Sequence, residues 1–489
     1  MTTATAPGRV WDLVVVGGGT AGLVGAKAAA GFGARVLLVE ADRLGGECLW
    51  TGCVPSKALL AAAAAAAGAR NAQRLGIRVS SVEVHFEAVM RRVHDAMATI
   101  APTDSADALE AAGVSVRFGR AVFTGPQTVA VDGETVRFRQ ALLATGSSPA
   151  VPPVPGLADA DALTSDTVWG LTTRPDRLAV LGGGSIGCEL GQAFARLGSA
   201  VTVVEAADHL LPGEDPAAGA LVRQALTADG VDVVTGTSAA TVHADAVDRA
   251  AGVLELSDGR PVAYDRLLVA VGRRPRTSEL GLDRAGVELD DRGMARVDSH
   301  LRTTNPRVWA AGDLTGHPQL THLAGVHATI AVTNALMGLR RSVAHEVVPR
   351  VTFTHPEVAA VGVPTDRPGA GMRVRTWDHA EVDRAVADDD VTGFSRLVVD
   401  RRGRVVGATL VGPRAGESLA EVVLAVRQRL RTRDLAGSTH AYPTYGDGVW
   451  NAAIADVRAG LRAPAAARTV GAASDIRRAW LGARDRLGR

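Results

Sequence analysis

The sequence predicts an α/β protein in which two similar parallel α/β domains precede a smaller α+β domain. The first observation is an internal repeat: VVVGGGTAGLVGAKAAAGFGARVLLVEA (14–41) aligns without a gap to AVLGGGSIGCELGQAFARLGSAVTVVEA (179–206). The second is a change of pattern after about residue 347, where short alternating strands such as RVTFT and SRLVVD surround a helical stretch at 417–431. A chain of 489 residues is also too long for one core, so its length favours about three domains.

Each copy of the repeat has the order of a Rossmann-like unit: a β-branched strand, a glycine turn, a helix with small residues, and a second strand that ends in glutamate. The residues that fit the dinucleotide fingerprint are Gly17, Gly19, Gly22 and Glu40 in the first copy, and Gly182, Gly184, Gly187 and Glu205 in the second. The first glycine makes the tight turn, the second lets the backbone approach a pyrophosphate, and the third lets the helix pack on its strand. The acid accepts hydrogen bonds from a ribose, so two strand-preceded copies predict two dinucleotide sites.

The rest of the chain is organised around these copies. Further strand ends carry small residues or an acid: Ala144, Thr145 and Gly146, then Gly272, then Gly312 and Asp313. We therefore expect a first dinucleotide domain in two parts (1–155 and 276–346), a second dinucleotide domain (156–275), an α+β unit (347–460) and an arginine-rich tail (461–489). The tail has seven arginines against two aspartates, and Ser474 with Asp475 is predicted to cap a final helix. That helix either packs on the protein's own dimer or docks to a partner.

Composition excludes several classes of protein. The chain is 47% hydrophobic and 21% charged with a net charge of +1, so it is a folded protein with no electrostatic case for binding nucleic acid or an anionic membrane. No signal peptide is evident, and the longest apolar stretch (58–69) is too short to span a bilayer, so no membrane insertion is expected. Three cysteines in so long a chain favour a reducing, cytoplasmic location.

Two of those cysteines, Cys48 and Cys53, stand close to Lys57, one of only two lysines in a chain with 51 arginines. In a regular helix their Cα atoms lie roughly 8.6 Å apart, whereas disulfides rarely tolerate more than about 7 Å. The intervening LWTG must therefore leave helical geometry if the two pair. Cys53 stands at the start of a predicted helix with Pro55 near its beginning, where backbone dipoles favour a thiolate. A zinc site lacks further ligands nearby, and two unreactive buried cysteines are the remaining alternative.

The stretch GGECLWTGCVPSK resembles the redox-disulfide motif of the class I pyridine nucleotide-disulfide oxidoreductases, a family that includes dihydrolipoamide dehydrogenase, glutathione reductase and mercuric reductase. Six motifs match in order between residue 10 and about 460, from the first glycine turn to HAYPTYGD (440–447). The resemblance implies an FAD domain interrupted by an NAD domain, and a C-terminal interface domain that makes a homodimer with a shared active site. It implies no resident metal.

The resemblance also assigns roles to single residues. Cys48 is implied as the thiol that attacks the substrate, and Cys53 as the thiolate against the flavin, with Lys57 and Glu189 beside the ring. The implied FAD-binding residues are Gly17, Gly19, Gly22, Glu40, Lys57 and Asp313. Further residues are expected to bind a cofactor: Gly46, Ala144, Thr145, Gly146, Gly272 and Gly312. The implied NAD-binding residues are Gly182, Gly184, Gly187 and Glu205. Because Glu205 is followed by Ala206, Ala207 and Asp208, with no arginine for a 2′-phosphate, NADH is expected in preference to NADPH.

The C-terminal motif departs from the family pattern. Where the family has a catalytic histidine and, five residues later, a glutamate, this chain has Tyr442 and Asp447. Tyrosine is a poor base at neutral pH. His440 is a displaced substitute or a structural interface residue, and Tyr445 adds a second aromatic ring. Mercuric reductase resembles this chain in having a tyrosine near that place, but its C-terminal cysteine pair is missing here, and Cys188 is expected to be a packing residue.

Three functions compete. The first is an NADH-dependent FAD disulfide oxidoreductase, similar to dihydrolipoamide dehydrogenase, that passes electrons through Cys48–Cys53 to a small or protein disulfide. The second is a quinone or metal-ion reductase, in which Tyr442 is tolerated because no thiol needs protonating. The third is a redox-sensing binding flavoprotein that docks a partner through its arginine-rich tail.

Overall fold

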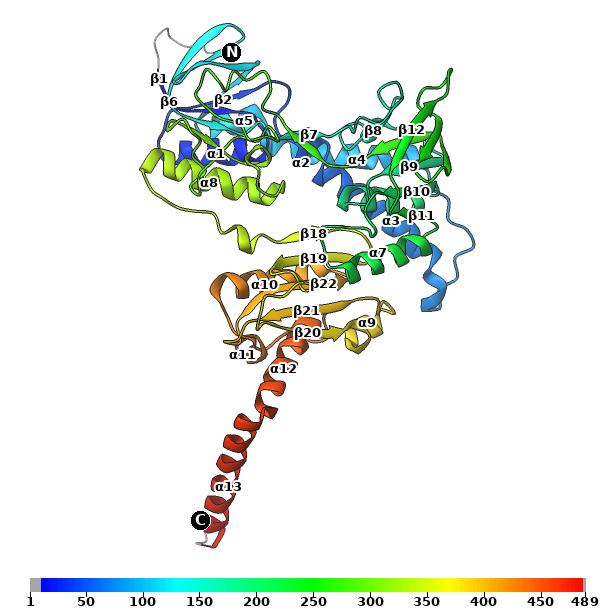
Figure 1. The fold of residues 1–489 in the computed structure, drawn as a ribbon, viewed down its shortest axis with the longest axis vertical. Helices are drawn as coiled ribbons and strands as arrows, with labels where there is room; N and C mark the ends of the chain where they lie inside the picture. Colours follow the sequence, from blue (N-terminus) through cyan, green and yellow to red (C-terminus); the bar gives the residue numbers. More distant parts are fainter. Residues whose placement is uncertain (1–9, 487–489) are drawn as a thin grey trace. The chain divides into compact units, whose positions relative to one another are not determined.

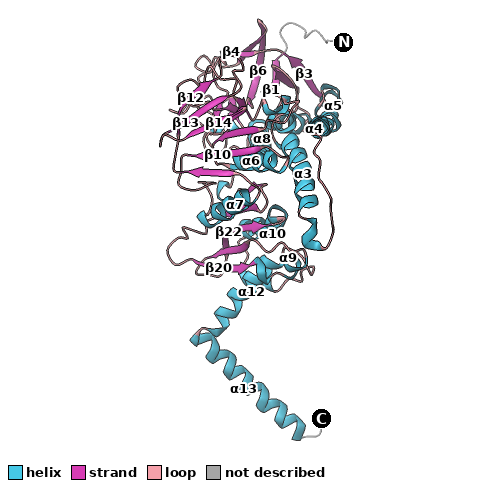
Figure 2. Ribbon diagram, turned by 90° about the vertical axis from the view of Figure 1, so that its right-hand side faces the viewer, coloured by secondary structure: helices cyan, strands magenta, loops and turns pink. Residues whose placement is uncertain are grey.

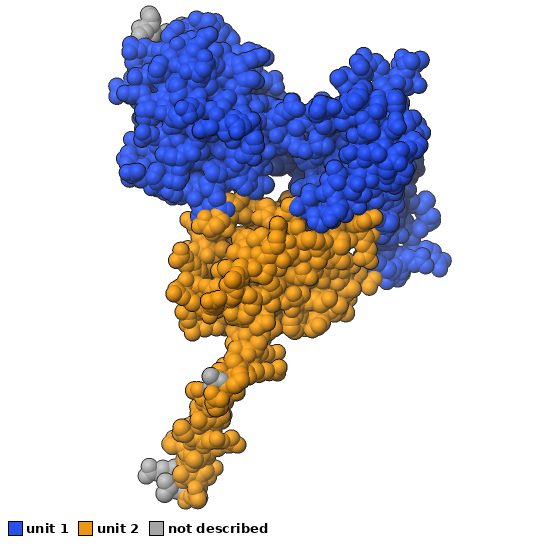
Figure 3. Space-filling model, in the orientation of Figure 1, with its two compact units in different colours: residues 1–212, 226–345 blue, residues 213–225, 346–489 orange. Residues whose placement is uncertain are grey.

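The computed structural model describes residues 10–486, which form two compact units. Unit 1 comprises residues 1–212 and 226–345, and unit 2 comprises residues 213–225 and 346–489 (Figure 3). Most of both predicted dinucleotide domains belongs to unit 1, and the predicted α+β domain belongs to unit 2. The boundaries expected between the two dinucleotide domains remain a prediction.

The first sheet of unit 1 has seven strands in the order β3-β2-β1-β6-β5-β4, with β17 paired to β6 (Figure 1). Its strands are β1 (Val10–Val16), β2 (Val36–Glu40), β3 (Val114–Phe118), β4 (Ala121–Gly125), β5 (Thr128–Val131), β6 (Glu134–Leu143) and β17 (Val308–Ala310). β1 pairs in parallel with both β2 and β6. This part of the sheet is packed on both faces, which explains the nearly continuous apolar run of β1.

Alternate residues of this sheet face two different cores. Leu13 and Val15 pack on one face against α1 (Thr20–Gly31) and α8 (Thr321–Met337). Val14 and Val16 point to the opposite face, where Phe138 is buried among them. The small residues of α1 are needed because a side chain at Gly25 would meet Leu142 of the sheet at 2.6 Å.

The second sheet of unit 1 repeats the first motif, with five strands in the order β11-β10-β9-β15-β8. Its elements are β8 (Leu163–Thr164), β9 (Arg177–Leu181), α6 (Ser185–Arg196), β10 (Ala200–Glu205), β11 (Asp232–Thr235) and β15 (Arg266–Val269), with β12 (Ala239–Ala244), β13 (Gly252–Leu256) and β14 (Pro261–Tyr264) in a separate three-stranded sheet. β9, α6 and β10 correspond to β1, α1 and β2. The predicted internal repeat is therefore a repeat of structure.

A short two-stranded sheet flanks the second α/β region in sequence. β7 (Ser147–Pro149) precedes that region, β16 (Arg273–Pro275) follows it, and the two pair antiparallel. The remaining helices of unit 1 are α2 (Gly46–Trp50), α3 (Cys53–Arg70), α4 (Phe86–Ile100) and α5 (Ala106–Ala111). The regular helix is interrupted at Thr51 and Gly52, between the two cysteines, as their spacing requires.

Unit 2 contains a five-stranded antiparallel sheet in the order β18-β19-β22-β21-β20. Its elements are β18 (Arg350–Thr352), β19 (Glu357–Gly362), β20 (Arg373–Asp378), α9 (Asp383–Ala387), β21 (Phe394–Val399), β22 (Val405–Gly412), α10 (Ala415–Gln428), α11 (Thr432–Ala436), α12 (Asp447–Arg462) and α13 (Pro464–Arg486). Residues 213–225, which include the start of α7 (Pro216–Ala228), group with this unit although we expected them in the second dinucleotide domain. Asp215 explains the grouping, because it accepts hydrogen bonds from Thr365 (2.6 Å) and Arg396 (2.7 Å).

The last helix begins earlier than predicted. α13 starts at Pro464, so Ser474 and Asp475 lie inside it and do not cap it. The break from α12 falls at Ala463, whose ψ of 141° is extended and which precedes a proline (Figure 2). Proline is well tolerated in the first turn of a helix, which is why the sequence allows a start at 464.

One stretch, Gly46–Arg70, is long and apolar enough to cross a membrane when judged by length and composition alone. It contains both α2 and α3, is interrupted at Thr51 and Gly52, and carries the ion-paired Lys57. An interrupted stretch with a paired charge does not have the form of a membrane span.

Candidate functional site

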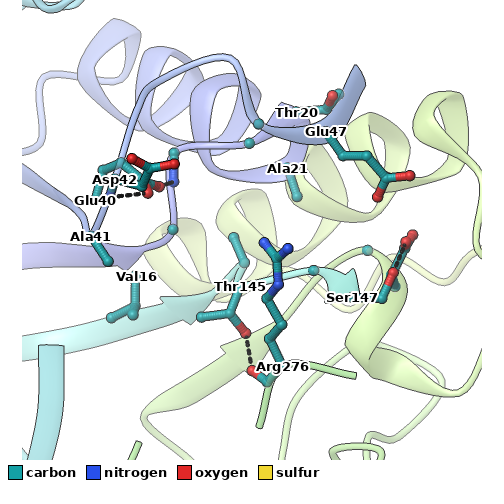
Figure 4. A pocket seen from close by; sticks show the side chains of 18 of the residues that line it. Val16, Thr20, Ala21, Glu40, Ala41, Asp42, Glu47, Thr145, Ser147 and Arg276 are labelled. Carbon is teal, nitrogen blue, oxygen red and sulfur yellow. Dashed lines mark hydrogen bonds between the residues drawn. The ribbon is translucent and has the colours of Figure 1, made fainter. Parts of the chain in front are cut away.

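A cavity of about 530 Å³ lies within unit 1 at the carboxyl ends of β1 and β2. Figure 4 shows Glu40 and Asp42 on one side of it and Glu47 and Ser147 on the other. Cys48 lines this cavity together with many of the expected cofactor-binding residues: Gly17, Gly19, Glu40, Gly46, Ala144, Thr145, Gly146, Gly312 and Asp313. Ligands of open α/β sheets bind at this end of the strands, so the location suits a dinucleotide.

The two glycine turns have the same geometry. Gly17 has φ +105° and Gly182 has φ +106°, and a Cβ on either would lie 2.4 Å from a carbonyl oxygen, that of Ala144 or Ala270. A Cβ on Gly22 or Gly187 would lie under 2 Å from the oxygen of the first glycine of its own turn. A side chain on any of these glycines would displace the helix N-terminus, whose free N–H groups hold a pyrophosphate.

The acids at the ends of β2 and β10 also correspond. Glu40 accepts hydrogen bonds from the backbone N–H groups of Gly18 (2.5 Å) and Asp42 (2.8 Å). Glu205 accepts from Gly183 (2.6 Å) and Ala207 (2.8 Å). Each carboxylate thus fixes its own glycine turn at the rim where a ribose would lie. Both cradles have the geometry of a dinucleotide site, and the expected order, FAD in the first and a nicotinamide dinucleotide in the second, remains a prediction.

Cys48 and Cys53 lie together as two thiols that hydrogen-bond each other. Cys53 is the first residue of α3, and its sulfur lies 3.3 Å from the hydroxyl of Thr321, the first residue of α8. The bond from Cys48 lowers the pKa of Cys53 to about 6; Thr321 and Lys57 also lower it, and burial opposes them. The pKa of Cys48 is raised, because its proton is held in the bond to Cys53 and because it is buried. Cys53 is therefore the thiolate of the pair.

Lys57 follows Cys53 by one helical turn on α3. Its Nζ lies 2.9 Å from Oε2 of Glu189, which is buried in α6 of the second repeat. The pairing of Lys57 with Glu189 is as predicted, and it fixes a positive charge close enough to Cys53 to lower its pKa. Cys188, next to Glu189, is fully buried and donates to the carbonyl of Gly183, so it is the packing residue that we expected.

Sequence reasoning missed a buried polar network beside Cys48. Arg273 of β16 donates through Nη2 to Glu47 and through Nε to the Ser147 hydroxyl at 2.7 Å. Ser147 in turn donates to Asp313 at 2.6 Å. Burial raises the pKa of Glu47 to about 7, although Arg273 acts to lower it. The signal in the sequence that could have indicated this network is Glu47, an acidic residue directly before Cys48.

The C-terminal motif of unit 2 contains no free base among its described residues. Tyr442 is 68% exposed and its hydroxyl donates to Asp383, which raises the pKa of the phenol. His440 is not a free imidazole, because its two ring nitrogens contact the Ser438 carbonyl (3.0 Å) and the Glu421 carboxylate (2.9 Å), which are both acceptors. Its ring also stacks on Trp450, which favours the structural alternative for His440.

Asp447 stands where the family has a glutamate. It is 3% exposed, and one oxygen accepts from the backbone of Thr444 at 3.1 Å. Its other oxygen, Oδ1, has no hydrogen-bond partner in the part of the chain that the structure describes. The side chain of Tyr445 is buried within unit 2, and its hydroxyl donates to Asp388 at 3.0 Å. Residues 10–486 contain no group of three or more His, Cys, Asp or Glu side chains suited to a metal ion.

Two glycine cradles, a polarised cysteine pair and a separate antiparallel unit define a flavoprotein oxidoreductase with a redox-active dithiol. Family models agree: the pyridine nucleotide-disulphide oxidoreductase model matches residues 11–328, and the dimerisation domain of the same family matches residues 348–453. The chain therefore belongs to the class I pyridine nucleotide-disulfide oxidoreductase family.

Individual relatives fall into more than one activity class. A mercuric reductase from Streptomyces lividans is 36% identical, over 89% of this chain and 94% of its own length. A dihydrolipoyl dehydrogenase from Chlamydia muridarum is 34% identical, over 90% of this chain and 96% of its own. The crystal structure of LpdA from Mycobacterium tuberculosis superposes with a TM-score of 0.83 at 31% identity, covering 91% of this chain and 99% of its own. The family uses FAD and NAD(P)H, and its dimerisation domain supports a homodimer.

Proposed function

We propose that this protein is an NADH-dependent FAD oxidoreductase that moves electrons into a Cys48–Cys53 pair and on to a small or protein disulfide in the cytoplasm. The single observation that carries this proposal is the placement of the pair: Cys53 begins α3 with its sulfur 3.3 Å from the Thr321 hydroxyl, and Lys57, one turn later, is held by Glu189. Bound FAD would supply the two-electron link between the nicotinamide and this pair. The preference for NADH is supported by Glu205, whose carboxylate would be repelled by a 2′-phosphate.

The chain's own residues have distinct tasks in this scheme. In this scheme the turn that begins at Gly17 and Asp313 would hold FAD, and the turn that begins at Gly182 with Glu205 would hold NADH. Lys57, fixed by Glu189, supplies positive charge beside Cys53. The resemblance assigns the attack on the acceptor to Cys48, since thiol–disulfide exchange needs one sulfur of the pair to form a mixed disulfide with the acceptor.

A second candidate is a quinone or metal-ion reductase, and the state of Tyr442 favours it. A phenol whose hydroxyl donates to Asp383 cannot take a proton from Cys48 at neutral pH, and His440 already contacts two acceptors. A metal ion or quinone does not require a protonated leaving thiol. Mercury is disfavoured as the metal, since the sequence lacks a C-terminal cysteine pair.

One acceptor panel separates the two leading candidates. Wild type and Tyr442→His are assayed with NADH against glutathione disulfide, lipoamide, a thioredoxin-type disulfide, a soluble quinone and Cu(II). The disulfide function predicts measurable disulfide turnover in wild type. It also predicts a gain of about 10²-fold in Tyr442→His, because an imidazole can act as a base at neutral pH where a phenol cannot. Quinone turnover that exceeds disulfide turnover in both proteins would establish the second candidate instead.

A further inference from the structure

The last helix of unit 2, α13, carries a stripe of exposed apolar side chains. Val470, Ile476 and Trp480 fall on one side of it by their spacing, and they are 50%, 72% and 48% exposed. The guanidinium carbons of Arg477 and Arg484 lie 4.2 and 5.7 Å from the centroid of the Trp480 ring, so positive charge borders the stripe. Large apolar side chains grouped on an exposed face mark an interaction surface.

α13 runs away from the body of its own unit. It follows α12 after the bend at Ala463, and Figures 1 and 2 show it extending away from the sheet formed by β18 to β22. Its 23 residues make an arm about 34 Å long. An arm of this direction and length presents its stripe to a second molecule rather than to its own unit.

A surface of opposite charge lies on the same unit, around α9. We call it the acidic patch and define it as residues 381–391, which contain one arginine and five acids: Glu381, Asp383, Asp388, Asp389 and Asp390. Val386 and Val391 are 56% and 41% exposed among these acids. Exposed apolar side chains within a negative surface suit a partner segment that is both apolar and basic.

α13 has that composition. It contains five arginines against two aspartates, whereas the whole chain has a net charge of only +1, so the separation of charge is a local feature. The dimerisation domain of the family matches residues 348–453, which include the acidic patch. α13 continues from α12, the helix in which that match ends. Both surfaces therefore belong to the part of the chain that joins two copies, or extend directly from it.

We propose that α13 is a dimer arm, which lies on the acidic patch of a second copy of this chain. Its apolar stripe contacts Val386 and Val391, and its arginines face the acids of the patch. Because both copies carry both surfaces, a two-fold dimer makes this contact twice. The arm also brings positive charge to Asp383, the acceptor of the Tyr442 hydroxyl, and so connects the added interface with the C-terminal motif.

The first experiment maps the contact on the FAD-loaded, full-length protein. Trp480 is replaced by the photoreactive residue p-benzoylphenylalanine, and the irradiated protein is analysed on a denaturing gel and by mass spectrometry of its peptides. We expect a product of twice the chain mass, in which position 480 is joined to a peptide from residues 379–391. A cross-link within one chain, a cross-link to another segment, or no cross-link between copies would overturn the inference.

Reversal of charge tests whether the pairing is specific. Arg477→Glu/Arg478→Glu on α13 should speed the exchange of subunits between two fluorescently labelled populations about tenfold at low salt. Glu381→Arg/Asp383→Arg in the acidic patch should have the same effect. The four substitutions together should return the exchange rate to within about twofold of wild type, because the reversed arm then meets a reversed patch. A merely structural defect in either element would not be rescued in this way.

Two further variants complete the test. Arg401→Glu/Arg402→Glu reverses two exposed charges in the turn after β21, at the opposite end of that strand from α9, and should exchange subunits as wild type does. Removal of residues 464–489 should speed exchange at least as much as reversal of the arm's charges. If α13 instead binds another protein or a membrane, truncation leaves the exchange rate unchanged. That result, or the absence of rescue in the fourfold variant, would overturn the inference.

Discussion

Matched substitutions in the two glycine turns test the assignment of the two dinucleotide sites. A Cβ on Gly22 would lie 1.8 Å from the Gly17 oxygen, and one on Gly187 would lie 1.9 Å from the Gly182 oxygen. Real Cβ atoms stay at least about 3.0 Å from such atoms, so each helix N-terminus must withdraw by about 1.2 Å in Gly22→Ala and about 1.1 Å in Gly187→Ala. Overpacking of this kind costs about 1–3 kcal/mol.

We expect that cost to appear mainly as lost affinity, because the withdrawn helix N-terminus is the part that holds the pyrophosphate. At about 1.4 kcal/mol per tenfold change, the range corresponds to roughly 5–150-fold weaker binding. Gly22→Ala should therefore be purified with less flavin and need more FAD for reconstitution. Gly187→Ala should keep its visible flavin absorbance but bind NADH more weakly in a calorimetric titration.

A third glycine serves as the control. A Cβ on Gly68 of α3 would meet nothing within 4 Å, so Gly68→Ala should bind both cofactors normally and be slightly more stable. Unchanged NADH affinity in Gly187→Ala would refute the assignment of the second turn. Loss of flavin from Gly187→Ala with full flavin in Gly22→Ala would show that the two sites are interchanged.

Three further predictions concern the cysteine pair. Lys57→Met should slow the formation of thiols by NADH about tenfold or more in stopped-flow measurements, whereas Lys57→Arg keeps the charge and should slow it less. Equal rates in wild type and both variants would contradict the role of that charge. The long-wavelength absorbance of the Cys53 thiolate against the flavin should grow as the pH rises through about 6, since the pKa of Cys53 is lowered to that value. Thr321→Val should move this transition to higher pH, because it removes a hydrogen bond that lowers the pKa of Cys53. An unmoved transition would mean that Thr321 does not act on Cys53. Arg273→Met should raise the pKa of Glu47, because Arg273 acts to lower it, and an unchanged carboxylate titration in infrared difference spectra against Glu47→Gln would contradict that contact.

Local sterics made much of the fold predictable. The glycine turns, the acid at the end of each second strand and the break between Cys48 and Cys53 all follow from requirements that act within about 30 residues. The two family models then confirmed the family and the C-terminal dimerisation domain that the motif order implied. The start of α13 was wrong by about ten residues, because a strong capping pair at Ser474 and Asp475 competes with a permissible proline start at Pro464.

The polar environment of the cysteines could not be predicted in the same way. Thr321 reaches Cys53 across 268 residues of sequence, and Arg273 reaches Glu47 across 226. No periodicity links such positions, since only the packing of separate elements brings them together. The pairing of Lys57 with Glu189, 132 residues apart, was predicted only through the resemblance.

The sequence by itself determined that this protein has two dinucleotide turns and a cysteine pair at a helix start, because backbone geometry and helix dipoles need only local residues. The helix start already favoured Cys53 as the thiolate, and the tertiary structure added the groups that lower its pKa further: Cys48, Thr321 and Lys57. It also pairs Tyr442 with Asp383 and His440 with Glu421, and it places Glu47 and Cys48 in the lining of one cavity. Hydrogen-bond partners and burial set the proton affinity of each group, and both exist only in the folded chain.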